Sequence, residues 1–183
     1  NASAAYAAGR VLGLGHEEAL AALGRFTGTL RRFQLITDTA GIRVYDDYAH
    51  HPTEIRAALS AARHATEVGN EDTGLDGRLI ACFQPHLYSR TRIFAERFAH
   101  ALAGADHVVL AGIYGAREDP EPGVDSTLIS SRVPGASYVE DMHEAARLAA
   151  SVTPEGGVCV TMGAGSITRC GDDVLEEWKR MEA

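Results

Sequence analysis

The amino-acid sequence predicts an α/β fold that is doubly wound, with a mostly parallel sheet and helices on both faces. Short apolar runs of strand length alternate along the chain with segments whose apolar residues recur at helical spacing. Two of these runs, residues 79–83 and 158–162, are apolar at nearly every position, which is typical of strands buried on both faces. A chain of 183 residues is also long enough for one stable core, because folding at this size removes roughly 70% of the unfolded surface from water.

The first 45 residues predict two helices followed by a pair of strands. Residues 4–12 and 19–26 each place apolar side chains on one helical face. Two short apolar runs follow at residues 33–37 and 42–45, and Gly41 breaks the chain between them. These runs therefore predict a strand, a turn and a second strand.

From Pro52 onward, helices and strands alternate regularly. Proline is favoured in the first turn of a helix, because the amide hydrogen that it lacks would have no partner there. Residues 69–77 are polar and contain glycine, and they predict a surface loop. The predicted helices lie near residues 52–62, 93–102, 127–132, 142–149 and 174–181, and the predicted strands at 79–83, 108–111, 137–139 and 158–162.

The charge of the chain argues against several classes of protein. It carries 17 Lys and Arg residues against 25 Asp and Glu, a formal net charge of −8, which disfavours a general nucleic-acid or membrane-surface binder. No apolar run approaches the roughly 20 residues that cross a bilayer, and no signal peptide is recognisable at the start. We therefore expect neither a nucleic acid nor a membrane among the partners.

The cysteines and the lysine add two further expectations. Cys82, Cys159 and Cys170 are odd in number and lack the spacing of paired ligands, which favours reduced thiols in a cytoplasmic protein. Lys179 is the only lysine, whereas a glycine-rich phosphate loop needs a lysine close behind its glycines. The chain therefore cannot supply such a loop itself.

Polar segments follow four of the predicted strands. In a sheet of this kind, ligands bind beyond the carboxyl ends of the strands, so four polar loops at one edge would form a continuous site. The segments are DDYAHHP at residues 46–52, QPHLYSRTR at 84–92, GIYGARE at 112–118 and GAGSI at 163–167.

The first of these loops has the densest group of titratable side chains. One interpretation is ligand handling, in which an Asp accepts ribose hydroxyls or helps to hold a metal, and a His contacts substrate. The alternative is helix capping together with a surface pair of histidines. The density and the position favour function. Because successive residues of a strand point to opposite faces, at most one of Asp46 and Asp47 is expected to face the site.

Arginines near the other loops favour an anionic ligand. Arg90 and Arg92 lie at the head of a predicted helix, where backbone N–H groups attract anions and a guanidinium binds carboxylate or phosphate. On the residues alone, a pair of solvated arginines is an equally good interpretation. Arg31 and Arg32 form a basic pair, which is usually a solvated face, but the turn at Gly28 beside them could aim one guanidinium at phosphate. The glycine loop could let backbone approach a ligand closely, although a tight turn explains it equally well.

The histidines divide into two groups. A metal centre is chemically conceivable from one carboxylate and three imidazoles, but their spacing matches none of the compact zinc signatures, and no metal site is predicted. Those four residues are Asp47, His50, His51 and His86. The remaining histidines lie in predicted helices or at a strand start and are expected to be structural. They are His16, His64, His100, His107 and His143.

Five motifs, taken together and in order, resemble those of the Mur ligases over essentially the whole chain. They are NASAA at residues 1–5, GTLRRF at 28–33, DDYAHHPT at 46–53, FQPHLYSRT at 83–91 and GAGSI at 163–167. The resemblance implies a three-domain enzyme of peptidoglycan synthesis, in which this chain is the Rossmann-like C-terminal domain at residues 27–183. Residues 1–26 would then be the tail of the central ATP-binding domain or linker helices.

The resemblance also implies a reaction. It points to the member of the family that joins L-alanine to UDP-N-acetylmuramate in the cytoplasm by ATP-dependent amide formation. ATP and Mg²⁺ would be bound mainly by the central domain. The isolated chain is therefore expected to be inactive.

Residue roles follow from the same resemblance. Asn1 would lie near the adenine, Arg32 would reach the ATP phosphates, and Asp47 would contact the nucleotide at its ribose. Arg90 would face the carboxylate of L-alanine. The expected catalytic residues are Arg32, Asp47 and His50. The residues expected around L-alanine are Tyr48, His50, His86 and Arg90.

Two departures and two alternatives stay open. Leu87 stands where some family members have Arg, and Ser166 stands where Asp or Asn is frequent, which leaves the amino-acid contact and the role of the glycine loop undecided. One alternative is the sibling ligase that reattaches recycled murein tripeptide to UDP-N-acetylmuramate, which more often has Phe at the position of Tyr48. The other is a stand-alone, non-catalytic module that binds a carboxylate or a nucleotide. The sequence does not indicate an oligomeric state.

Overall fold

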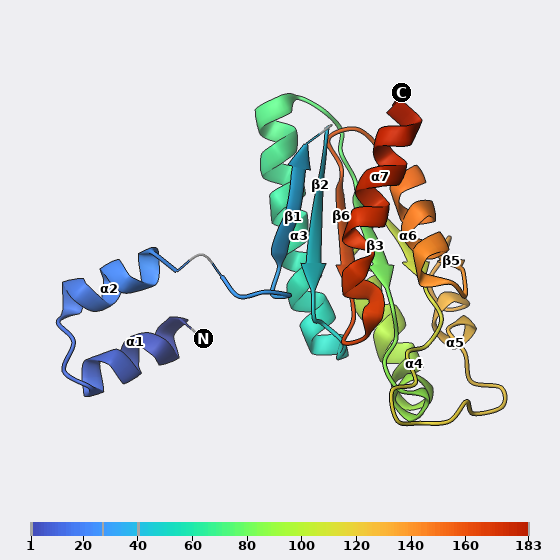
Figure 1. Cartoon of the computed structure of the whole chain (residues 1–183), viewed down its shortest axis with the longest axis horizontal. Coiled ribbons are helices and arrows are strands. Elements are labelled where there is room, and N and C mark those ends of the chain that lie inside the picture. The colour runs from blue at the N-terminus through green and yellow to red at the C-terminus, as the bar shows by residue number, and fades with distance from the viewer. Residues whose placement is uncertain (1, 27, 40, 183) are drawn as a thin grey trace.

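A mixed sheet forms the centre of the α/β part of the chain (Figure 1). The computed structural model describes residues 2–26, 28–39 and 41–182. The strands are β1 (Gln34–Thr39), β2 (Ile42–Asp47), β3 (Leu79–Phe83), β4 (His107–Leu110), β5 (Ser137–Tyr138) and β6 (Val158–Met162). Their order in the sheet is β1-β2-β6-β3-β4-β5, in which β1 is antiparallel to β2 and all other neighbouring pairs are parallel. The predicted α/β fold with a mostly parallel sheet is confirmed.

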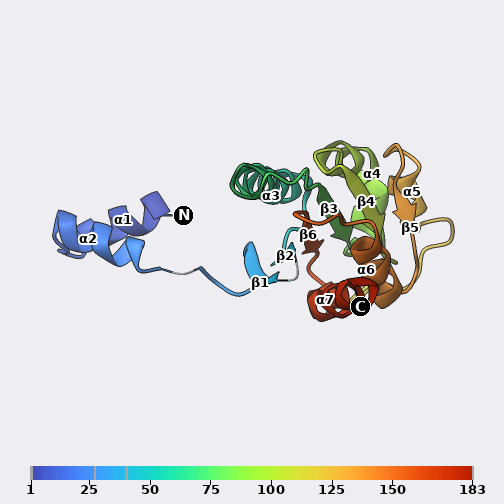
Figure 2. The ribbon, with the colours of Figure 1, turned by 90° about the horizontal axis from the view of Figure 1, so that it is seen from above.

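Helices cover both faces of the sheet (Figure 2). They are α3 (Pro52–Thr73), α4 (Tyr88–Leu102) and α5 (Thr127–Ser130) on one face, and α6 (Met142–Ser151) and α7 (Gly171–Glu182) on the other. In β3, Leu79, Ala81 and Phe83 pack toward the first group, whereas Ile80 and Cys82 pack toward the second. Alternating side chains of one strand thus enter two separate cores, which is why the strand is apolar at every position.

Helix α3 is longer than predicted. It begins at Pro52 behind His51, whose side chain accepts a hydrogen bond from the amide of Thr53. It continues to Thr73 and ends at Gly74, which has φ +71°. The predicted loop at residues 69–77 is therefore wrong in its first half. The polar residues there still propagate the helix, and the glycine in the left-handed conformation ends it.

Two helices precede the sheet and form a hairpin that stands apart from it (Figure 1). Helix α1 (Ala2–Val11) and helix α2 (His16–Gly24) were both predicted, and the hydroxyl of Tyr6 lies 2.7 Å from Nδ1 of His16 between them. Ala19 is the buried residue of this hairpin in the described part of the chain. The domain boundary predicted at residues 26 and 27 stays a prediction.

Two expectations from composition concern the whole chain. Cys82, Cys159 and Cys170 are all free and buried, which agrees with the predicted reduced thiols. Among the described residues, no helix is long and apolar enough to cross a membrane.

Candidate functional site

The candidate site lies where strands β2, β3 and β6 end. Asp47 of β2 and Phe83 of β3 both pair with Met162 of β6, so the loops after these strands leave the sheet at the same level. The fourth loop joins them through a parallel bridge between His86 and Tyr114. The predicted gathering of four polar loops at one edge of the sheet is confirmed.

Four rings from three of these loops form a continuous row. The ring centroids of Tyr48 and His50 are 5.2 Å apart, and those of His50 and His86 are 5.9 Å apart. The ring of Tyr114 stacks on His86 with a centroid distance of 5.7 Å. Tyr48, His50 and His86, which the sequence predicted as neighbours, are therefore brought together. Tyr114 was not singled out as a site residue.

Arg90 and His86 each bring an unsatisfied nitrogen to this edge. Nη1 of Arg90 and Nδ1 of His86 are buried and have no hydrogen-bond partner within the described residues. Arg90 lies in the first turn of α4, which is held by Glu118 through hydrogen bonds from the amide of Ser89 (2.9 Å) and from its hydroxyl (2.5 Å). A buried polar group without a partner costs about 1–3 kcal/mol, so this pair needs an explanation.

The two arginines at the head of α4 have different surroundings. Nε of Arg92 lies 2.9 Å from Oε1 of Glu121, and its side chain is 54% exposed. Residues two apart on a helix point to different sides, so Arg92 pairs on the surface while the guanidinium of Arg90 is partly buried. Between the two candidates, the structure favours Arg90 as an anion ligand.

His50 is fixed by its own loop. Its Nδ1 lies 3.0 Å from the carbonyl oxygen of Tyr48 and 3.3 Å from Oε2 of Glu54. Both oxygens accept hydrogen bonds, so Nδ1 carries the proton and, in the neutral ring, Nε2 keeps a free lone pair. Burial alone would raise the pKa of Glu54, but backbone N–H groups of His50 and His51 and the nearby His50 ring lower it below its ordinary value.

Asp46 and Asp47 serve different parts of the structure, as their alternation predicted. The carboxylate of Asp47 accepts hydrogen bonds from the amides of Phe33 and Ala49, both at 2.7 Å. Burial raises the pKa of Asp47 above its ordinary value, while these two N–H groups act in the opposite direction. Asp46 instead accepts hydrogen bonds from the hydroxyls of Thr161 and Thr168, at 2.9 and 2.6 Å.

Arg31 lies at the candidate site, and the sequence did not separate it from Arg32. Its Nη2 donates to the carbonyl oxygens of Gly163 (2.7 Å) and Gly165 (3.2 Å), and its Nε lies 3.6 Å from Oδ2 of Asp46. The guanidinium of Arg32 is exposed, lies 5.7 Å from the ring centroid of Tyr48, and forms no hydrogen bond or ion pair within the described chain. The sequence indicated the pair of arginines as a candidate phosphate contact. Only the fold shows that Arg31 is bound within the chain and that Arg32 is exposed.

The glycine loop approaches protein rather than open space. A Cβ atom on Gly165 would lie 2.6 Å from Oε1 of Gln84 and 2.6 Å from the ring of Tyr114. Gln84 also accepts a hydrogen bond from the amide of Ile167 at 3.1 Å, where the loop enters a short 3-10 helix. The structure thus favours the tight-turn interpretation of this loop. Gln84 and Tyr114 impose the glycine, and neither was predicted to do so.

Two further expectations from the sequence concern Asn1 and metal binding. Asn1, predicted near the adenine, lies outside the described residues. Within the described chain, the group of three side chains close enough to share a metal ion lies elsewhere, at His143, Cys170 and Asp173.

The lowered pKa of His86 should make the free energy of unfolding depend on pH. Burial, with smaller contributions from Arg90 and His50, lowers the pKa of His86 below its ordinary value of 6.5. The unfolded chain therefore binds a proton at higher pH than the folded chain, so the contribution of His86 to stability is complete above about pH 6.5 and is lost as the pH falls. In denaturant titrations, His86→Gln should lose less stability between about pH 7 and 5 than the native chain. His64→Gln, at an exposed position of α3, is the control, and an unchanged pH profile for His86→Gln would contradict the prediction.

The fold and the site together define a Rossmann-like domain with cationic and imidazole groups at the carboxyl edge of its sheet. Residues 31–165 match the model of the family described as Mur ligase, glutamate ligase domain. The chain belongs to this family, which confirms the resemblance seen in the motifs.

Individual relatives with known names also belong to the Mur ligases. The chain is 48% identical over 178 residues to the UDP-N-acetylmuramate–L-alanine ligase of Thermobifida fusca, a match that covers 96% of this chain and 38% of that protein. The solved UDP-N-acetylmuramate–alanine ligase of Thermotoga maritima matches with a TM-score of 0.74 and 28% identity, over 98% of this chain and 37% of that one. A murein peptide ligase of Psychrobacter arcticus, with a TM-score of 0.63 and 23% identity over 94% of this chain and 35% of that one, shares the fold. This chain thus spans little more than a third of the length of these proteins.

Proposed function

We propose that this chain is the domain of an ATP-dependent ligase that binds L-alanine and closes over the nucleotide, while the rest of the enzyme holds UDP-N-acetylmuramate. The observation that carries the proposal is the pair of buried nitrogens without partners, Nη1 of Arg90 and Nδ1 of His86. The third buried nitrogen without a hydrogen bond in the described chain, Nε of Arg31, faces the carboxylate of Asp46 at 3.6 Å. Since buried polar atoms are nearly always paired in proteins, the two that face no such group indicate a polar ligand. The identity to the Thermobifida fusca L-alanine ligase supports the choice of amino acid.

A free amino acid offers the groups that these residues need. The guanidinium of Arg90 would bind the carboxylate through charge-assisted hydrogen bonds. Because its pKa is lowered, His86 is neutral near pH 7, and Nδ1 can accept a hydrogen bond from the ammonium group when the proton lies on Nε2. The rings of Tyr48 and Tyr114 stand at the two ends of the row.

The nucleotide would approach the edge of the sheet where β1 begins and β2 ends. Arg32 is exposed and its guanidinium forms no hydrogen bond or ion pair with the described residues, so it is available for the phosphates of ATP. Each oxygen of Asp47 already accepts one backbone hydrogen bond and retains a second lone pair for a ribose hydroxyl. Asp47 would therefore act both as a nucleotide contact and as the anchor of the segment that carries Arg32.

The proposed reaction has two steps. The muramoyl carboxylate attacks the γ-phosphorus of ATP and ADP leaves, which produces an acyl phosphate. The ammonium group of the bound L-alanine first gives one proton to water. The resulting amine then attacks the acyl carbon, phosphate leaves, and the nitrogen loses a second proton. His50 would accept that proton on Nε2, because Nδ1–H is held by the carbonyl of Tyr48. Arg32 would oppose the negative charge on the transferred phosphoryl group.

The residues of this edge do not fit a Mg²⁺ ion. Magnesium prefers carboxylate oxygens and keeps several waters. Asp46 is buried and accepts hydrogen bonds from two threonine hydroxyls, so Asp47 is the one carboxylate at the end of β2 with lone pairs left for a ligand, and a single carboxylate is too few to form a Mg²⁺ site by itself. We propose that Mg²⁺ is held with ATP by the rest of the enzyme. The enzyme would act in the cytoplasm.

Phosphate release by the full-length enzyme tests the proposal. With ATP, Mg²⁺ and UDP-N-acetylmuramate present, L-alanine should drive phosphate release and murein tripeptide should not. Release with tripeptide alone would instead identify the recycling ligase, and no release with either would favour a binding module. The 183-residue chain serves as the control and should release no phosphate, because it contains no lysine-bearing phosphate loop.

A further inference from the structure

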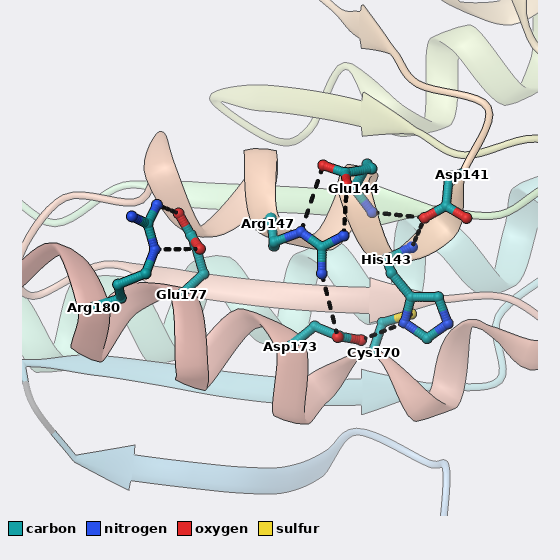
Figure 3. A network of polar contacts seen from close by, with 8 residues as sticks. All are labelled: Asp141, His143, Glu144, Arg147, Cys170, Asp173, Glu177 and Arg180. Atoms are coloured by element: carbon teal, nitrogen blue, oxygen red, sulfur yellow. Dashed lines mark hydrogen bonds and ion pairs between the residues drawn. The ribbon is translucent and has the colours of Figure 1, made fainter.

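A second cluster of functional side chains lies behind the glycine loop, at the start of helices α6 and α7 (Figure 3). His143 comes from the first turn of α6, Cys170 from the residue before α7, and Asp173 from the first turn of α7. One ligand atom of each lies within 4.8 Å of the others. None of these residues takes part in the proposed ligation.

We propose that His143, Cys170 and Asp173 bind a divalent cation of the zinc class, with water as the fourth ligand. A thiolate, an imidazole and a carboxylate form a ligand set that suits Zn²⁺. The side chains of His143 and Asp173 are 43% and 21% exposed, so water can reach the cation, whereas Cys170 is fully buried beneath them.

The distances fit a shared ion. Nδ1 of His143 lies 2.8 Å from Oδ2 of Asp173 and 3.9 Å from Sγ of Cys170. Ligand atoms at ordinary zinc bond lengths lie roughly 3.2–3.8 Å from one another around a tetrahedral ion. The two observed distances lie on either side of that range, so small side-chain movements would admit the ion.

The arrangement argues against a nucleophilic Cys-His-Asp triad. In such a triad the imidazole contacts the nucleophile with one nitrogen and the carboxylate with the other. Here Cys170 and Asp173 both face Nδ1 of His143. A single nitrogen cannot relay a proton between them, but three ligand atoms that converge on one another can surround a cation.

Neighbouring side chains orient the carboxylate. Asp173 turns Oδ2 toward His143 and Oδ1 toward Nη1 of Arg147, at 3.8 Å. Arg147 is itself held by Glu144, with Nη2 2.7 Å from Oε1 (Figure 3). Partners of this kind fix metal-binding carboxylates in many sites. On binding, the Cys170 thiol would release its proton, and His143 would carry its proton on Nε2, which frees the lone pair of Nδ1.

Cation titrations of the untagged 183-residue chain test the proposal. One equivalent of Zn²⁺ should bind in competition with a chromogenic chelator, and Co²⁺ should produce a thiolate charge-transfer band in the near ultraviolet. Cys170→Ser should abolish that band, and both Cys170→Ser and Asp173→Asn should weaken Zn²⁺ binding at least tenfold. Circular dichroism establishes that each variant is folded. If Cys170→Ser does not fold, the partly exposed Asp173→Asn decides the matter.

Matched variants locate the ion. Cys82→Ala removes another buried thiol on β3, and His86→Gln removes an imidazole of the candidate substrate site; both should leave Zn²⁺ affinity unchanged. The proposal is overturned if less than one equivalent binds or if the Co²⁺ complex has no sulfur band. It is equally overturned if affinity depends on His86 and not on Cys170 or Asp173.

Discussion

Replacing Arg90 with alanine in the full-length enzyme should raise the KM for L-alanine roughly 10- to 150-fold and leave the KM for ATP nearly unchanged. A hydrogen bond to a charged group contributes about 1.5–3 kcal/mol, and 1.4 kcal/mol corresponds to a factor of ten. The guanidinium of Arg90 has a buried nitrogen without a partner, so its removal should cost binding and not folding. Phosphate-release kinetics at varied L-alanine and at varied ATP provide both constants.

Arg92 supplies a matched control on the same helix. Its guanidinium pairs with Glu121 on the surface, and its side chain is 54% exposed, so Arg92→Ala should change neither KM by more than about twofold. Arg90→Lys should recover part of the loss, because lysine keeps the charge without the planar fork of donors. Equal increases in both KM values for Arg90→Ala, or a larger effect from Arg92→Ala, would assign the amino-acid carboxylate to another residue.

Most of the fold was predictable because the apolar periodicities of the chain are clear. The strand at residues 79–83 is apolar throughout, and its alternate side chains fill two cores beneath different helices. The end of α3 was not predictable, because its last turn is polar and packs little. Local interactions extend the helix there: Asn70 bonds Gly77 twice across the turn, at 3.1 and 3.0 Å, and Gly74 ends it.

The site was predictable as a set of loops but not as individual contacts. Arg31 and Arg32 are adjacent and chemically alike, and they differ only because Asp46 and the glycine loop lie on one side of the chain. Tyr114 reaches the site through a bridge to a residue far from it in sequence, which no local pattern indicates. The spacing of residues in the sequence indicates which side chains share one face of a helix or strand, but not what packs against that face. The site contacts between residues distant in sequence could therefore not be predicted.

A large loss of stability should follow from Asp46→Ala, at about 3 kcal/mol of unfolding free energy. The side chain of Asp46 is only 1% exposed and accepts hydrogen bonds from Thr161 and Thr168, in addition to its ion pair with Arg31. Alanine would leave both hydroxyls and the guanidinium without this acceptor. Denaturant titrations should show a lower midpoint with an unchanged slope.

Asp38→Ala is the matched control, because Asp38 is an exposed carboxylate on the neighbouring strand and should change stability by less than about 0.5 kcal/mol. A double-mutant cycle with Arg31→Ala measures the ion pair itself, since the two residues share the contact at 3.6 Å. A loss below about 1 kcal/mol for Asp46→Ala, or strictly additive effects with Arg31→Ala, would show that the network does not hold the segment to the glycine loop. A non-additive loss in the double variant would mean that Asp46 fixes the position of Arg31. Through the adjoining backbone, Asp46 would then also fix the position of Arg32.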